Sequence, residues 1–160
     1  MNQVVSVQKR GGQDVSGQTQ DFVTMFIDNY LFGIPVLTVQ DVLNPQSITR
    51  IPLAPREVAG SLNLRGRIVT AIDVRLRLGL PKRADISRSM SVVVDIGGEL
   101  YSLLVDSVGE VLSLPTASFE RNPPTLDPLW REFSVGIYRL SGKLLVVLDV
   151  NRLLDLSKSD

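Results

Sequence analysis

Apolar and polar residues alternate along most of this chain in short runs that turn residues interrupt. The runs FVTMFI (22–27) and MSVVVDI (90–96) are rich in β-branched and aromatic residues, which favours strands. Turn residues follow each run, and a second apolar run comes after them, so two β-hairpins are predicted. Further strands are predicted in GRIVTAIDV (66–74) and GKLLVVLDV (142–150), each followed by a short helical turn or a strand end. The pattern predicts an all-β protein.

The chain repeats itself. A shift of 69 residues lays 23–43 over 92–112, where seven of 21 aligned positions are identical. A shift of 76 lays LRGRIVTAIDV (64–74) over LSGKLLVVLDV (140–150). A period near 70 residues is too long for a solenoid repeat and fits two copies of a small β-barrel.

Each copy is predicted to form five strands, because a closed five-stranded barrel leaves few exposed edges. We place a disordered tail at 1–20, one barrel at 21–84 and a second at 85–156, with the boundary in the charged segment PKRADISRS (81–89). Barrels of this size bury little surface alone, so the two are expected to share a core. Together they make one domain.

The composition excludes several classes of function. The charges of the 17 basic and 17 acidic residues among 160 cancel. The chain therefore lacks the excess of positive charge with which proteins bind nucleic acid or an anionic membrane. There is no cysteine and no histidine, which excludes disulfides, thiolate chemistry and the commonest general base. No apolar run is long enough to span a bilayer or to form a signal peptide. We expect a cytoplasmic protein without cofactor or metal, and without membrane insertion of its own.

Carboxylates are the remaining candidates for chemistry. Asp73 and Asp149 occupy the same place in the two repeats, at the end of a predicted strand. One interpretation is a paired-carboxylate hydrolase. The other, favoured because no further polar cluster shapes a site, is that each carboxylate bonds to its local backbone. The sequence therefore predicts no catalytic residue and no enzyme.

Several residues are candidates for partner contacts. Arg65 breaks the repeat, since its counterpart is Ser141, and it lies in the predicted turn NLRG. An arginine there either anchors an interface or is simply solvated. Val39 and Val111 either form an exposed apolar row for a partner or pack in the core. Trp130, the single tryptophan, either pins its proline-rich loop to a barrel or contacts a partner.

The segment GSLNLRGRIVTAIDVRLRLGL (60–80), with FGIPVLTVQDVL (32–43) before it and VVVDIGGELYSLLVDSVGEVLSL (92–114) after it, resembles the CheW family of chemotaxis coupling proteins. The resemblance runs from about Phe22 to Leu156. It implies two SH3-like five-stranded β-barrels, in agreement with the duplication. It also implies an adaptor that joins a CheA-type histidine kinase to chemoreceptors in signalling arrays. The family often has Glu at Asp41 and proline at Thr70.

The resemblance also implies partners and sites. The partners are the regulatory domain of a CheA-type kinase, the cytoplasmic tip of chemoreceptors and other CheW-like proteins in rings, which places the protein at arrays on the inner face of the membrane. The receptor-binding groove is expected at Val39, Asp41, Gly60, Arg65, Met90 and Val111. Kinase-binding residues are expected at the exposed barrel ends, at Asn44, Ile48, Tyr138 and Leu140. The structural motif comprises Asn63, Gly66, Asp73, Gly142 and Asp149.

Two other functions stay open at this point. A coupling protein of a related chemosensory pathway, for example one that controls pili, has the same sequence features. A small barrel can also bind nucleic acid or oligosaccharide, but such a module uses a basic, aromatic face. The chain has only nine aromatic residues, several of them in predicted core strands, which disfavours that alternative.

Overall fold

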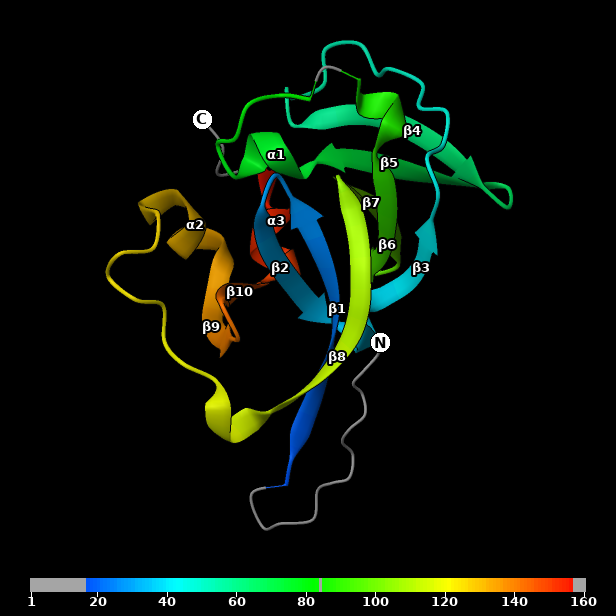
Figure 1. Cartoon of the computed structure of the whole chain (residues 1–160). Coiled ribbons are helices and arrows are strands. Elements are labelled where there is room, and N and C mark those ends of the chain that lie inside the picture. Colours follow the sequence, from blue (N-terminus) through cyan, green and yellow to red (C-terminus); the bar gives the residue numbers. More distant parts are fainter. Residues whose placement is uncertain (1–16, 84, 157–160) are drawn as a thin grey trace.

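The structure, a computed structural model, describes residues 17–83 and 85–156. Strands of this part of the chain form two five-stranded sheets (Figure 1), which confirms the predicted all-β class. The strands are β1 (Thr19–Ile27), β2 (Tyr30–Pro35), β3 (Val39–Leu43), β4 (Val58–Leu64), β5 (Arg67–Asp73), β6 (Met90–Ile96), β7 (Glu99–Val105), β8 (Ser107–Pro115), β9 (Ser134–Leu140) and β10 (Lys143–Leu148). The helices are α1 (Val74–Arg77), α2 (Pro128–Phe133) and α3 (Val150–Leu153), with 3₁₀ turns η2 (Val36–Thr38), η3 (Ile86–Arg88) and η4 (Thr116–Ser118).

The two repeats interlock. Sheet A has the strand order β8-β1-β2-β10-β9, and sheet B has the order β3-β6-β7-β5-β4. Each sheet therefore combines the hairpin of one repeat with the last three strands of the other. The pairing registers correspond: Val146 lies opposite Phe32 where β10 runs parallel to β2, and Thr70 lies opposite Tyr101 where β5 runs parallel to β7. These pairs are related by the shifts of 69 and 76 residues, so the duplication is present in the structure.

The expected division at residue 84 does not follow the sheets. Sheet A takes strands from both 21–84 and 85–156, and so does sheet B. The reason is that a lone hairpin has two unpaired edges, and strands of the other repeat cover both. Of the tail expected at 1–20, residues 1–16 lie outside the described residues, whereas Thr19 and Gln20 already belong to β1.

The core has three parts. The largest cluster lies between the sheets and joins side chains such as Met25 and Phe32 of sheet A to Ile72 and Val94 of sheet B. A smaller cluster lies within each sheet, one including Leu145 in sheet A and the other including residues of β4 to β7 in sheet B. The two sheets thus share a core, as their small size requires.

A short helix appears where the sequence analysis expected only a loop. Asp127 caps α2 by accepting a hydrogen bond from the Leu129 backbone N–H at 2.8 Å, and proline occupies the first helical position. Trp130 on this helix is buried, and its indole Nε1–H donates to the Leu78 carbonyl at 2.8 Å. Its ring packs edge-on against Tyr30 and Phe32. Trp130 therefore pins this segment to the core.

Candidate partner-binding surface

An exposed ion pair joins the edge of sheet B to a hairpin turn. The Arg65 guanidinium donates to Asp41 Oδ2 at 2.8 Å, and the Arg65 side chain is 75% exposed. Asp41 Oδ1 accepts a hydrogen bond from the Val42 backbone N–H at 2.9 Å. The hydrogen bond from Arg65, together with that from Val42, lowers the pKa of the Asp41 carboxyl. The structure thus brings together two of the six expected receptor-groove residues in one charged feature.

The NLRG turn explains how Arg65 is presented. Arg65 has φ 51° and Gly66 has φ 84°, so both central residues of this two-residue hairpin turn are left-handed. The Asn63 side chain accepts a hydrogen bond from the Gly66 N–H at 3.0 Å and closes the turn. The guanidinium therefore projects from a rigid hairpin rather than from a long loop.

The other expected groove residues differ in exposure. Val111 on β8 is exposed, whereas Val39 on β3 and Met90 on β6 are half-buried against the shared core. Gly60 is buried, and a Cβ there would lie 2.3 Å from the Thr49 carbonyl oxygen, so it holds the 48–49 segment against β4 rather than offering a surface. The polar pair and Val111 are the accessible members of the expected groove.

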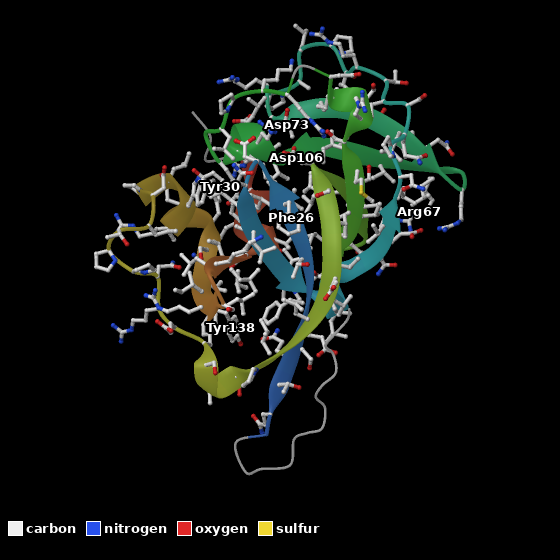
Figure 2. The ribbon with its side chains drawn as sticks, in the orientation of Figure 1. Phe26, Tyr30, Arg67, Asp73, Asp106 and Tyr138 are labelled. Carbon is white, nitrogen blue, oxygen red and sulfur yellow. The ribbon has the colours of Figure 1, made fainter. Side chains whose placement is uncertain are left out.

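The expected kinase-binding residues also separate into two groups. Asn44 is exposed, and Ile48 and Leu140 are half-buried. Tyr138 was expected at an exposed barrel end, but its side chain is only 2% exposed. It packs against the rings of Phe22 and Phe119, because β9 turns this position into the interior of sheet A (Figure 2). Its expected exposure is therefore wrong.

An apolar pocket of about 440 Å³ opens beside Tyr138. Apolar side chains of β1, β9 and β10 line it, together with Pro35, Thr38 and Phe119. Leu37 lies between two of these lining residues and is 95% exposed, and Val135 and Phe119 are exposed as well. Sequence reasoning missed this pocket, although one signal was available: Leu37 aligns with the charged residue Asp106 of the other repeat.

The two equivalent carboxylates cap short helices. Asp73 Oδ1 accepts a hydrogen bond from the Leu76 N–H at 3.3 Å at the start of α1, and Asp149 Oδ1 accepts one from the Arg152 N–H at 3.2 Å at the start of α3. This matches the local-backbone interpretation. The segments after the two strands are therefore helical turns.

Replacing Asp73 tests its role as a cap. Asp73→Ala should lower the free energy of unfolding by about 1 kcal/mol, because the Leu76 N–H loses its acceptor. Burial raises the pKa of Asp73 above the usual 3.8, because the folded protein disfavours the ionised carboxylate. As the pH rises from 3.8 through the pKa of the folded protein, the unfolded chain ionises first, and the free energy of unfolding therefore falls. Asp73→Asn keeps an acceptor and removes this pH dependence. Denaturant unfolding at several pH values measures both effects; equal destabilisation by Asn and Ala at neutral pH would contradict the capping role.

No helix within 17–83 and 85–156 is long and apolar enough to cross a membrane. Nor do three or more acidic side chains gather to form a metal site in that part of the chain.

The two interlocked sheets carry an exposed ion pair, exposed valine and leucine side chains and an apolar pocket. These features are typical of a protein that binds other proteins. The family comparison is specific: a CheW-like domain model matches residues 21–158, and the chain belongs to this family.

Known relatives agree. The chain is 29% identical over 151 residues to "Chemotaxis protein CheW" of Klebsiella aerogenes, covering 94% of this chain and 89% of the relative. It is 25% identical over 142 residues to the protein of the same name from Helicobacter pylori, covering 89% and 86%. The crystal structure of the scaffolding protein TtCheW from Thermoanaerobacter tengcongensis is similar, with a TM-score of 0.76, 31% identity, and coverage of 86% of this chain and 94% of that chain.

Proposed function

We propose that this protein is a chemotaxis adaptor that couples transmembrane chemoreceptors to a CheA-type histidine kinase by protein–protein binding, in the cytoplasm at receptor arrays. The observation that carries the proposal is the CheW-like match, which spans both sheets. Similarity to a structure described as a scaffolding protein supports it. The adaptor acts by holding partners together and catalyses no reaction of its own.

The receptor contact is proposed on the face that carries the Asp41–Arg65 pair. A receptor tip is a helical hairpin, and such a partner needs exposed apolar contacts beside a charged anchor. Val111 supplies exposed apolar surface, and Arg65 supplies a guanidinium that is ion-paired yet accessible. Asp41 orients this guanidinium, because its carboxylate accepts a hydrogen bond from the Arg65 Nη2.

Arg65→Ala should weaken receptor binding roughly 5- to 30-fold and leave the fold intact, because the guanidinium is exposed and only its contact with Asp41 is lost. Arg67→Ala is a matched control in the same hairpin, since Arg67 donates to the Gly98 carbonyl at 3.2 Å and does not touch Asp41. Titration of each variant with a receptor hairpin measures the effect. Equal affinity of the Arg65 variant and the unmodified protein would place the receptor elsewhere.

The kinase contact is proposed at the apolar pocket of sheet A. Leu140 is the last residue of β9, two residues after Tyr138, which forms part of the pocket wall rather than a direct contact. Asn44 and Ile48 lie at the end of β3 in sheet B, where a second kinase subdomain or a neighbouring CheW-like protein would bind. Separate receptor and kinase faces allow both partners to bind at once, so array strength comes from multivalency.

Leu37→Asp should weaken binding of the kinase regulatory domain about tenfold or more, because it places a charge beside the apolar pocket. Leu53→Asp is the matched control: Leu53 is equally exposed but lies in the β3–β4 connection, away from the pocket. Isothermal titration with the isolated regulatory domain measures both. Loss of affinity in both variants, or in neither, would contradict the proposed kinase face.

A further inference from the structure

Three charged side chains meet where the two sheets join, and a fourth, Arg83, approaches Asp106 Oδ1 at 3.8 Å. Arg75 lies on α1, directly after β5 of sheet B. Asp106 lies between β7 and β8, where the chain passes from sheet B to sheet A, and Figure 2 shows it at the start of β8, near α1. Asp28 lies in the turn between β1 and β2 of sheet A. Each residue thus belongs to a different connection.

The contacts among these residues are short and directional. Arg75 donates from Nε to Asp106 Oδ1 at 3.0 Å and from Nη2 to Asp106 Oδ2 at 2.8 Å, which makes a bidentate pair. Nη2 also donates to Asp28 Oδ1 at 2.5 Å, and Nη1 donates to the Pro81 carbonyl at 2.8 Å. The Asp28 N–H donates to Asp106 Oδ2 at 2.7 Å. Four of these five hydrogen bonds connect segments that are distant in the sequence, and the fifth, to the Pro81 carbonyl, lies within the β5–β6 connection.

Burial makes this network stronger than an ordinary surface pair. The side chains of Arg75 and Asp106 are 13% and 18% exposed. A bidentate arginine–carboxylate contact in such partial burial is fixed in geometry and little screened by salt. Although burial opposes the ionised carboxylate, the hydrogen bonds from Arg75 and from the Asp28 N–H hold the pKa of Asp106 below its usual value.

The second junction of the fold lacks every one of these groups. The repeat shifts place Leu37 at the position of Asp106, Gly97 at that of Asp28 and Asn151 at that of Arg75. Leu37 projects into solvent, and Asn151 lines the apolar pocket of sheet A. The duplication thus has two equivalent junctions, of which one is closed by ionic contacts and the other is open.

We propose that Arg75, Asp28 and Asp106 form a clasp that fixes the angle between the two sheets at one junction, while the open junction carries the relative motion of the sheets. A packed core shared by both sheets permits only small displacements, of the shear type. Contacts at one side restrict such displacements there and leave the other side free. The clasp is a property of the fold and does not depend on the proposed function.

The absence of cysteine makes a distance measurement between the sheets direct. Spin labels are attached at Ile68→Cys on the outer face of β5 and at Ser141→Cys in the β9–β10 turn, both exposed and outside the clasp. Double electron–electron resonance then reports one distance between sheet B and sheet A. The clasp is broken by Arg75→Met, which keeps the aliphatic stem, and by Asp106→Asn, which keeps the volume. Arg67→Met is the control, because that arginine contacts only sheet B.

With circular dichroism confirming that a variant is folded, breaking the clasp should broaden the distance distribution about 1.5-fold or more, and the control should leave it unchanged. If Arg75→Met fails to fold, Asp106→Asn gives the same test. A distribution of unchanged width in a folded clasp variant would overturn the proposal. Conversely, Leu37→Asp combined with Asn151→Arg should narrow the distribution, and an unchanged width would contradict the assignment of motion to the open junction.

Discussion

Trp130→Ala should lower the free energy of unfolding by about 3–5 kcal/mol, the range for removing a large buried aromatic side chain. The indole ring contacts Tyr30 and Phe32 at centroid distances of 4.8 and 5.1 Å, and its N–H satisfies the buried Leu78 carbonyl. Alanine would leave a cavity and an unpaired acceptor. Denaturant unfolding followed by circular dichroism measures the loss, since the chain's single tryptophan is removed.

Trp130→Phe separates the two contributions. It keeps most of the ring volume and removes only the hydrogen bond to Leu78, so it should cost about 1–3 kcal/mol. A cost for Trp130→Ala no greater than that of an exposed substitution would show that α2 is not pinned to the core in solution.

Gly60→Ala and Gly136→Ala should each destabilise the fold by roughly 2–5 kcal/mol, combining left-handed strain with a backbone clash. These glycines are equivalent in the two repeats and have φ of 151° and 157°. A Cβ at Gly60 would lie 2.3 Å from the Thr49 carbonyl oxygen, and one at Gly136 would lie 2.6 Å from the Glu120 carbonyl oxygen. In both places an isolated bridge joins the neighbouring residue to a long connection, which cannot move away without losing its hydrogen bonds.

Gly142→Ala is the control for the clash. Gly142 has φ 75°, but a Cβ there would meet nothing within 4 Å, so only the conformational cost of roughly 1–2 kcal/mol is expected. Thermal or denaturant unfolding of the three variants gives the comparison. Similar destabilisation at all three positions would mean that the long connections move away from the added methyl groups. That result would contradict the close packing at Gly60 and Gly136.

The sequence predicts local structure well where a local pattern decides it. The hairpin at 22–34 follows from two apolar runs around Asp28. For the segments after Asp73 and Asp149 the sequence left a helical turn or a strand end open, and in the structure both carboxylates cap helical turns. The duplication is visible in the amino-acid sequence because equivalent strands bury equivalent side chains. The all-β class is confirmed for these reasons.

Pairing between repeats could not be predicted in the same way. Alternation shows which face of β5 is buried, but it does not distinguish β7 of the other repeat from a strand of its own repeat. The burial of Tyr138 was missed for a related reason, since the face that β9 turns inward depends on the sheet it joins. The open junction was missed because Leu37, Gly97 and Asn151, which take the places of the three charged residues, are far apart in the sequence.

The most direct test of the adaptor proposal is a set of binding titrations. The purified protein is titrated separately with a receptor hairpin and with the regulatory domain of a CheA-type kinase, and then with the second partner in the presence of the first. The proposal predicts roughly micromolar binding to each partner and simultaneous binding of both. It also predicts that Arg65→Ala weakens only the receptor complex and Leu37→Asp only the kinase complex. Binding to neither partner, or mutual exclusion of the two, would contradict it.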